Sequence, residues 1–283
     1  MMKFNDFNKL DKTAAAKELF SCCGSDHWVA SMMDHFPFAT AEEMIDAATH
    51  TWYDQCKKTD WLASFDHHPK IGDTKSLQKK FAGDEQSGIT QATAETITAL
   101  LHANKTYENK FGFIFIVCAT GKSADEMLRL LNDRINNSEK EELDIAMGEQ
   151  HKITIIRLQK LMPEENWSFL GVSQLTTHVL DTSIGKPGYN ISIRLLHCPE
   201  DQWQVMAQGI TNKDGRIGDL LPQRKKLIPG IYKLVFVTGN YFFDRDIETF
   251  YPEVEIQFML SDDAHYHVPL LINPFGYSTY RGS

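Results

Sequence analysis

Hydrophobic positions in the first half of the chain repeat with the period of an α-helix. In residues 138–161 they lie three, four or seven residues apart, with Glu and Lys between them: Leu143, Ala146, Met147, Ile153 and Ile156. This spacing gathers apolar side chains on one face of a helix. The segments Thr40-Ala41-Glu42-Glu43 and Ser123-Ala124-Asp125-Glu126 have the pattern of capping boxes, which start helices. The chain therefore predicts an all-α domain over residues 1–162.

After Trp167 the period of the hydrophobic positions becomes two. In residues 252–260, Val254, Ile256, Phe258 and Leu260 alternate with mostly polar neighbours, as in a half-buried strand. Residues 189–197 and 231–237 have a similar pattern. Turn signals separate these runs: Lys186-Pro187-Gly188, Lys213-Asp214-Gly215 and Pro229-Gly230. We predict an antiparallel, all-β sandwich over residues 173–283, joined to the first domain by a short linker over residues 163–172.

Length and composition fit a folded protein of two domains. The 283 residues exceed the ~100–200 that are usual for one domain. The formal net charge is -9 and the acidic residues are scattered, so we expect no binding to nucleic acid. No apolar run approaches the ~18 residues of a membrane span, and residues 1–10 lack the features of a signal peptide. We expect a cytoplasmic protein that does not bind membranes.

Cysteine usage indicates reduced thiols. The five cysteines are odd in number and lack the spacing of zinc ligands: Cys22, Cys23, Cys56, Cys118 and Cys198. Such residues are most often small buried hydrophobic side chains, and a disulfide framework would need an even set. We therefore predict neither disulfides nor a metal site.

Polar residues of catalytic type recur in the C-terminal part. They are His178, Arg216, the pair His265 and His267, and Tyr280 in the closing Tyr-Arg-Gly-Ser. Taken singly, each has an ordinary explanation, because a strand histidine is usually hydrogen-bonded or at the surface, and Asp-Gly-Arg is usually a turn. In a strand, His265 and His267 share a face, so both can approach one site.

Together these residues resemble the 5-hydroxyisourate hydrolases, the transthyretin-related enzymes, over about residues 173–283. The motifs that carry the resemblance are Leu175 to Asp181 (LTTHVLD), Gly185-Lys186-Pro187, Thr211 to Arg216 (TNKDGR), Phe250 to Val254 (FYPEV) and His265 to Ser283. The resemblance implies a short β-sandwich that assembles as a homotetramer, with active sites where subunits meet. It places His178, Arg216, His267 and Ser283 at catalytic positions and Tyr280 beside the substrate. Counting back from the terminal serine selects His267 rather than His265.

The chemistry of ring-opening hydrolysis suits these residue types. A histidine, which titrates near pH ~6.5, can accept a proton from water at neutral pH. An arginine can stabilise negative charge on the attacked carbonyl oxygen while it orients an oxygen-rich ring. We assign this second role to Arg216, and expect the hydroxyl or carboxylate of Ser283 to position the water.

The N-terminal part has a second group of candidate residues. His67-His68-Pro69-Lys70-Ile71-Gly72 combines a histidine with a proline that stiffens the chain and a glycine that permits a tight turn. Glu85 and Gln86 follow within Gly83 to Gly88, and Arg157 comes much later. Loops of this kind often hold functional groups, although single His-Pro and Glu-Gln pairs are common in solvated loops.

This second group resembles the 2-oxo-4-hydroxy-4-carboxy-5-ureidoimidazoline (OHCU) decarboxylases over roughly residues 4–162. Further motifs in the same order support it: Tyr107 to Phe113 (YENKFGF) and Cys118 to Ser123 (CATGKS). The resemblance implies an all-helical, often dimeric decarboxylase without a cofactor, which yields (S)-allantoin. His68 is then the catalytic acid/base, Glu85 and Gln86 orient the substrate ring and hydroxyl, and Pro69 and Arg157 contact the substrate. His67 departs from the family, which usually has a small residue there, and a second imidazole could disturb the titration of His68.

The two resemblances reinforce each other, since the second family acts on the product of the first. We therefore predict a cofactor-free bifunctional enzyme of urate catabolism. It would hydrolyse 5-hydroxyisourate to OHCU and then decarboxylate OHCU to (S)-allantoin. Two alternatives stay open: a transthyretin-like carrier that binds a ligand without reacting it, and a chain in which only one domain is active. A carrier would not be expected to keep His178, Arg216, His267 and the final Tyr-Arg-Gly-Ser.

Overall fold

A computed structural model of the chain describes residues 2–68 and 94–282. The chain forms two compact units, residues 1–124 with 146–171, and residues 125–145 with 172–283. The sequence-based domain bounds differ from this division, because they assign residues 125–145 to the N-terminal domain. Those bounds, 1–162 and 173–283 with a linker between them, stay a prediction.

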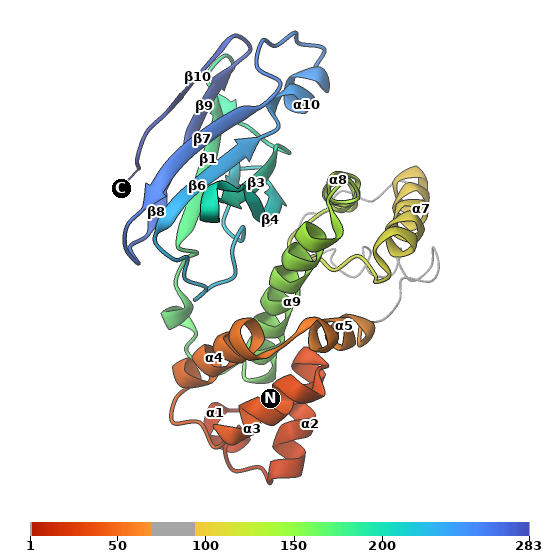
Figure 1. Ribbon diagram of the computed structural model, residues 1–283, viewed down its shortest axis with the longest axis vertical. Helices are drawn as coiled ribbons and strands as arrows, with labels where there is room; N and C mark the ends of the chain where they lie inside the picture. The colour runs from red at the N-terminus through yellow and green to blue at the C-terminus, as the bar shows by residue number, and fades with distance from the viewer. Residues whose placement is uncertain (1, 69–93, 283) are drawn as a thin grey trace. The chain divides into compact units, whose positions relative to one another are not determined.

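The described part of the first unit is helical. Its elements are α1 (Phe4–Phe7), α2 (Lys12–Cys23), α3 (Asp26–Asp34), α4 (Ala41–His50), the π-helix η1 (Thr51–Gln55), α5 (Lys58–Asp66), α7 (Ala94–Phe111), the later part of α9 (Glu139–Leu161) and the 3₁₀ turn η3 (Ser168–Leu170). Figure 1 shows α1 to α5, in red to orange, gathered together. Their apolar faces enclose a core that includes the fully buried Trp28 and Trp52. The predicted helical class is confirmed for these residues.

Helix α4 begins where the capping pattern predicts. The Thr40 hydroxyl accepts the Glu43 backbone N–H at 3.0 Å, and the Glu43 carboxylate accepts the Ala39 N–H at 2.8 Å. These bonds satisfy backbone donors that have no partner inside a first helical turn. The second predicted capping pattern begins at Ser123, directly before helix α8 (Ala124–Arg134).

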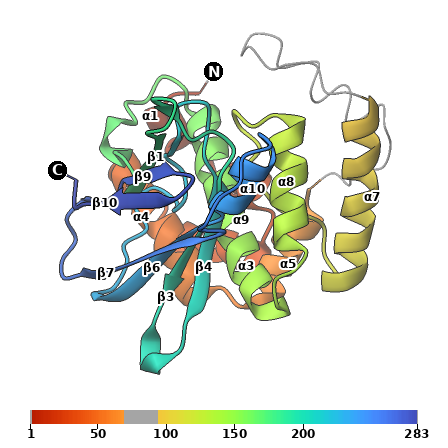
Figure 2. The ribbon, with the colours of Figure 1, turned by 90° about the horizontal axis from the view of Figure 1, so that it is seen from above.

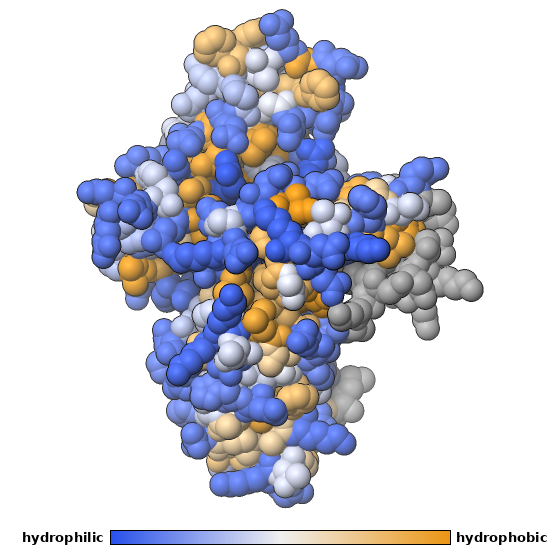
Figure 3. Space-filling view, turned by 45° about the vertical axis from the view of Figure 1, so that its right-hand side comes forward, coloured by the Kyte–Doolittle hydropathy of each residue, from blue (hydrophilic) through white to orange (hydrophobic). Residues whose placement is uncertain are grey.

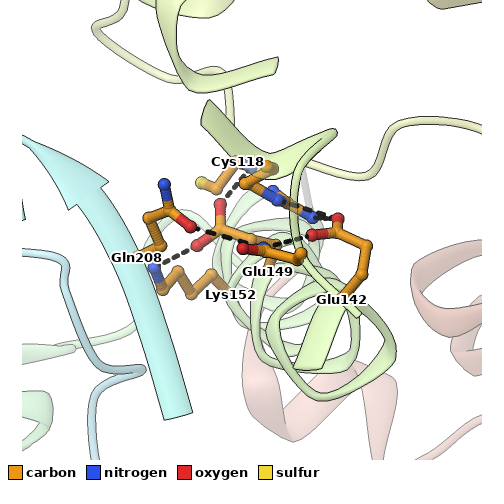
Figure 4. Close-up of polar contacts among 7 residues, drawn as sticks. Cys118, Glu142, Glu149, Lys152 and Gln208 are labelled. Carbon is orange, nitrogen blue, oxygen red and sulfur yellow. Dashed lines mark hydrogen bonds and ion pairs between the residues drawn. The ribbon is translucent and has the colours of Figure 1, made fainter. Parts of the chain in front are cut away.

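Buried charged residues hold α9 against the segment that precedes α8. The Glu149 carboxylate accepts the Cys118 backbone N–H at 2.7 Å and also pairs with the Lys152 ammonium (Figure 4). A buried carboxylate is costly unless it is paired and hydrogen-bonded, and here it is both. The arrangement fixes the rotation of α9 about its axis, and α9 supplies two further residues to the site described below.

The second unit contains a β-sandwich. Its strands are β1 (Leu175–Asp181), β2 (Lys186–Pro187), β3 (Ser192–His197), β4 (Gln204–Ile210), β5 (Arg216–Ile217), β6 (Gly230–Phe236), β7 (Val254–Leu260), β8 (Tyr266–His267), β9 (Leu270–Asn273) and β10 (Gly276–Thr279). The 3₁₀ turn η4 (Pro199–Asp201) lies between β3 and β4, and helix α10 (Thr238–Phe243) follows β6. One sheet has the order β10-β9-β1-β2, with β5 and β8 also paired to β1, and the other has the order β4-β3-β6-β7. In Figure 2, β1, β9 and β10 lie together, apart from β3, β4, β6 and β7.

The period-two pattern of residues 254–260 is confirmed in β7. Val254, Ile256 and Leu260 are buried, whereas Glu255, Gln257 and Met259 are exposed. Most strand pairs are antiparallel, as expected, but one sheet also contains parallel pairs. Strand β1 pairs with β8 and β9 in parallel. Between β1 and β8 the chain passes through β6 and β7 of the other sheet, and β8 and β9 then run in the same direction as β1. Register between segments so distant is not encoded in local periodicity.

Figure 3 shows hydrophobic residues, in orange, among hydrophilic ones, in blue, on the visible face. In the second unit several large apolar side chains are exposed: Phe243, Phe250, Met259, Phe275 and Tyr280. Within residues 2–68 and 94–282, no helix has the length and hydropathy to span a bilayer.

Candidate active sites

Strand β1 carries the first group of candidate residues on its outer face. Leu175, Thr177, Val179 and Asp181 are buried, while the alternate residues Thr176, His178 and Leu180 are half-buried. In the ladder, His178 stands opposite Arg216 of β5, and Thr176 stands opposite His267 of β8. Residues paired in either ladder point to the same face of the sheet, and in the antiparallel β1–β5 pair their Cβ atoms lie about 4.5–5.5 Å apart. The sheet therefore brings His178, Arg216 and His267 together.

Thr176 links the two neighbouring histidines. Its hydroxyl lies 2.9 Å from Nδ1 of His267 and 2.9 Å from Nε2 of His265. A hydroxyl has one proton to donate, so Thr176 donates to one ring and accepts from the other. His265, which the motif count did not select, thus shares a hydrogen-bonding network with His267.

A tight turn places Arg216 opposite His178. Oδ1 of Asn212 accepts the backbone N–H groups of Asp214 and Arg216, at 2.9 and 3.0 Å. Gly215 has φ of 68°, and a Cβ there would lie 2.3 Å from the Val179 carbonyl oxygen. Only glycine fits this left-handed position so close to β1. The Asp214-Gly215-Arg216 motif is therefore a turn, as expected of such a tripeptide, and it also aims an arginine at the candidate site.

Both half-buried imidazoles are biased toward their neutral form. Burial lowers the pKa of His178, and the Arg216 charge lowers it further, while a hydrogen bond with the Asp214 backbone acts in the opposite sense. Burial likewise lowers the pKa of His267, with further lowering from Arg216, His265 and His178. A low dielectric and a nearby cation both disfavour the imidazolium. Two neutral histidines beside a fixed positive charge can accept a proton and stabilise an anion.

The C-terminal segment returns to the same face. The Gly282 backbone N–H donates to the His267 carbonyl oxygen at 2.8 Å, and a Cβ at Gly282 would lie 2.5 Å from Cδ2 of His267. The glycine of Tyr-Arg-Gly-Ser thus permits close approach to the imidazole. Tyr280 is exposed on this segment, and Ser283 lies outside the described residues.

The second group of candidates meets between α5 and α9. His68 follows the end of α5 and is half-buried, with Nε2 2.5 Å from Oε1 of Gln150 and Nδ1 3.4 Å from a guanidinium nitrogen of Arg157. Gln150 and Arg157 are seven residues apart on α9 and so lie on one face of that helix. The predicted pair of His68 and Arg157 is brought together. Pro69, Glu85 and Gln86 lie outside the described residues.

Backbone carbonyl groups at the end of α2 complete this second group. The Cys22 carbonyl oxygen accepts a guanidinium N–H of Arg157 at 3.2 Å, and that of Cys23 accepts the Gln150 amide at 3.4 Å. They face the site because α2 ends there, at Gly24, in a left-handed conformation with φ of 83°. These bonds restrain the arginine and the glutamine before any substrate binds.

His67, the departure from the family pattern, packs away from the hydrogen bonds of His68. Its ring lies edge-on against Phe20, with centroids 5.1 Å apart. A Cβ at Gly24 would lie 2.4 Å from Cβ of His67, so glycine is required for this contact. The effect of His67 on His68 titration stays a prediction.

Sequence reasoning missed two residues of these groups, Thr176 and Gln150. Thr176 could have been found from strand alternation, because it shares the face of His178 within the LTTHVLD motif. Gln150 could have been found from helical spacing, seven residues before Arg157. Neither residue type is distinctive alone, which is why the pattern did not single them out.

Comparison with known proteins gives matches to both halves of the chain. The OHCU decarboxylase model matches residues 8–159, and the HIUase/Transthyretin family model matches residues 175–282. The uric acid degradation bifunctional protein TTL of Arabidopsis thaliana is 32% identical over 317 residues, covering 93% of this chain and 96% of that protein. The chain belongs to both of these families. It is an enzyme with an OHCU decarboxylase domain followed by a hydroxyisourate hydrolase domain.

Single-domain relatives match the hydrolase domain alone. A 5-hydroxyisourate hydrolase of Mus musculus is 46% identical over 114 residues, covering 39% of this chain and 96% of that protein. The 5-hydroxyisourate hydrolase of Salmonella typhi is 42% identical over 114 residues, covering 40% of this chain and 83% of that protein. The hydrolase domain of this chain thus corresponds to nearly the whole length of these single-domain enzymes.

Proposed function

We propose that this chain hydrolyses 5-hydroxyisourate to OHCU in its C-terminal domain and decarboxylates OHCU to (S)-allantoin in its N-terminal domain. The observation that carries the proposal is the pairing of imidazole and guanidinium groups in each unit. His178 and His267 lie with Arg216, and His68 lies with Arg157. We propose domain bounds of 1–162 and 173–283 for the two activities.

In the hydrolase domain, His267 is the proposed general base. Thr176 holds Nδ1 of this ring, which leaves Nε2 to accept a proton from water. The resulting hydroxide adds to a ring carbonyl carbon, the carbon–nitrogen bond then breaks, and the departing nitrogen takes up the proton. His267 is neutral at physiological pH because its pKa is lowered by burial and by neighbouring charge.

We propose that Arg216 stabilises the negative charge that develops on the attacked carbonyl oxygen. Arg216 stands opposite His178 in the ladder, and a guanidinium group carries the positive charge that an oxyanion needs. His178 orients the substrate ring beside it, and Tyr280 borders the site. We assign Ser283, through its hydroxyl or terminal carboxylate, to positioning of the water, as the family resemblance implies.

In the decarboxylase domain, Arg157 is the proposed contact for the substrate carboxylate or a ring carbonyl. His68 withdraws a proton from the substrate hydroxyl as carbon dioxide leaves, and the substrate ring takes up the remaining electron pair. We propose that no cofactor is needed, since the ring itself delocalises these electrons. A proton then returns to one face only, which sets the configuration of the product. Glu85, Gln86 and Pro69 are proposed to orient the ring.

Gln150 is a proposed positioning residue that sets the tautomer of His68. The Gln150 amide nitrogen faces the Cys23 carbonyl oxygen, an acceptor only, so its oxygen faces His68. The proton of a neutral His68 ring is therefore on Nε2, and Nδ1 keeps a lone pair toward Arg157. The base is then the nitrogen that lies beside the anion-binding arginine.

Replacing Gln150 tests this role through the pH profile of decarboxylation. An acceptor opposite Nε2–H stabilises the imidazolium, so Gln150→Ala is expected to move the acid limb of kcat to lower pH. Gln150→Glu, which keeps an acceptor and adds negative charge, is expected to move it to higher pH. The control is Gln159→Ala on the same helix, which should leave the limb in place. If the acid limb of kcat lay at the same pH in Gln150→Ala and Gln150→Glu, the proposed role of Gln150 would be wrong.

Self-association through the C-terminal domain is also proposed, as a tetramer, with further dimer contacts through the N-terminal domain. The outer face of β1 leaves His178 and His267 only half-buried, and a neighbouring subunit would close that site. Among the described residues β10 forms an edge of its sheet, and exposed Phe275 and Tyr277 lie at or beside it. Exposed apolar groups of this kind favour an interface between subunits.

The whole proposal is tested by supplying freshly generated 5-hydroxyisourate and recording absorbance and circular dichroism together. We expect accelerated loss of the hydroxyisourate absorbance, followed by the dichroism signal of (S)-allantoin. A transthyretin-like carrier would produce neither change. A chain with one active domain would accelerate the loss of hydroxyisourate without producing an optically active product, or would act only on supplied OHCU.

A further inference from the structure

Three side chains with metal-binding atoms meet in the first unit, apart from the residues of the decarboxylase site. They are His27 of α3, Cys56 directly after η1, and Asp60 in the first turn of α5. One ligand atom of each lies within 4.8 Å of the others. His27 is exposed, Cys56 is buried and Asp60 is half-buried. Within residues 2–68 and 94–282 this is the only group of three such residues.

Local structure holds two of these groups in place. The Cys56 backbone N–H donates to the Thr51 carbonyl oxygen at 2.9 Å, which closes η1 and turns the chain toward α5. Oδ2 of Asp60 accepts the Lys57 backbone N–H at 2.8 Å and so caps α5. The other carboxylate oxygen of Asp60 is left for a further ligand. The backbone of Cys56 and the carboxylate of Asp60 are thus held before any ion binds.

The third group is on a well-anchored helix. The neighbouring residue Trp28 is fully buried and donates its indole N–H to the Ala48 carbonyl oxygen at 3.2 Å. Successive helical residues point about 100° apart, so His27 is directed outward next to Cys56. Its side chain is exposed, so solvent can reach the group from this side.

We propose that His27, Cys56 and Asp60 bind one zinc ion. Thiolate, imidazole and carboxylate together are a zinc ligand set, whereas calcium and magnesium require oxygen ligands only. Bond lengths of about 2.0–2.3 Å in a tetrahedral site place ligand atoms roughly 3.3–3.8 Å apart. Rotation of His27 closes the remaining distance, and a water completes the four ligands. The Cys56 thiol releases its proton to solvent when the bond to zinc forms.

The ion would tie α3 to the beginning of α5. Helix α5 ends at Asp66, and His68 follows two residues later. Zinc at the beginning of α5 would therefore restrain the helix that leads into the decarboxylase site, without touching substrate. The expected result of binding is a higher thermal unfolding temperature of the full chain, since the ion binds the folded state and not the separated ligands.

Cobalt titration of the full chain, after removal of metal with a chelator, tests the site. Cobalt(II) in a tetrahedral site with one thiolate gives visible ligand-field bands and a sulfur-to-cobalt charge-transfer band in the near ultraviolet. We expect both, with saturation at one ion per chain and displacement by zinc. Cys56→Ser is expected to remove the charge-transfer band. His27→Gln and Asp60→Asn are each expected to weaken binding by at least the ~10–100-fold that loss of an outer-shell group costs.

Matched controls separate this site from other thiols and imidazoles. Cys198→Ser and His35→Gln change residues outside the group and should leave the cobalt spectrum and affinity unchanged. If Cys56→Ser fails to fold, the His27 and Asp60 variants still decide, because unchanged affinity in both overturns the proposal. Absence of the charge-transfer band in the native chain, or its persistence in Cys56→Ser, also overturns it. The sequence-based prediction of no metal site would then hold for this group.

Discussion

Replacing His68 by alanine is expected to lower the rate of OHCU decarboxylation by about 10²–10⁴-fold, the usual contribution of a positioned acid/base. Loss of hydroxyisourate should proceed at the native rate, because the hydrolase residues belong to the other domain. The cause is removal of the imidazole that lies 3.4 Å from Arg157 and 2.5 Å from Gln150. Circular dichroism at the (S)-allantoin signal, with OHCU supplied directly, measures the effect.

The matched control for His68 is its neighbour. His67→Ala removes a ring that packs on Phe20, so this variant is expected to keep most of the decarboxylase activity. A similar loss of decarboxylase activity in both variants would show that His67 and His68 act together. Full decarboxylase activity in a folded His68→Ala variant would remove His68 from the mechanism.

Arg216→Ala is expected to lower kcat/KM for hydroxyisourate hydrolysis by about 10²–10³-fold, the usual cost of losing one donor to a developing oxyanion. Decarboxylation of supplied OHCU should be unaffected. Absorbance decay of hydroxyisourate, corrected for the uncatalysed reaction, measures the loss. Arg194→Ala is the control, because Arg194 pairs with Glu253 on the other sheet. If Arg216→Ala abolished both activities in a folded chain, the two-site proposal would be wrong.

The same variant makes a prediction about pH. The lowered pKa values of His178 and His267 keep both rings neutral below the ordinary value of 6.5, so native hydrolysis should persist below pH 6.5 and fall only in more acid solution. Removing the Arg216 charge removes one cause of that lowering. The acid limb of the residual activity is therefore expected to move to higher pH in Arg216→Ala. A limb that stays in place would mean that neither histidine titrates in the reaction.

Much of the fold follows from local patterns in the sequence. The alternation of Val254, Ile256 and Leu260 with polar neighbours predicts β7, and Thr40 with Glu43 predicts the start of α4. These features depend on neighbours a few residues away, where side-chain period and backbone hydrogen bonding are set by the sequence itself. The motifs around His68, His178 and Arg216 also indicate the two families without any coordinates.

The class of each domain and the two families thus follow from the sequence alone, and the site residues are predictions made from the same motifs. The parallel pairing of β1 with β8, and the link that Thr176 makes between His265 and His267, emerge only in the folded chain. The same is true of the contact between Gln150 and His68 and of the meeting of His27 with Cys56 and Asp60. The reason is that these contacts join segments distant along the chain. Their register depends on how whole strands and helices pack, and no local period records it.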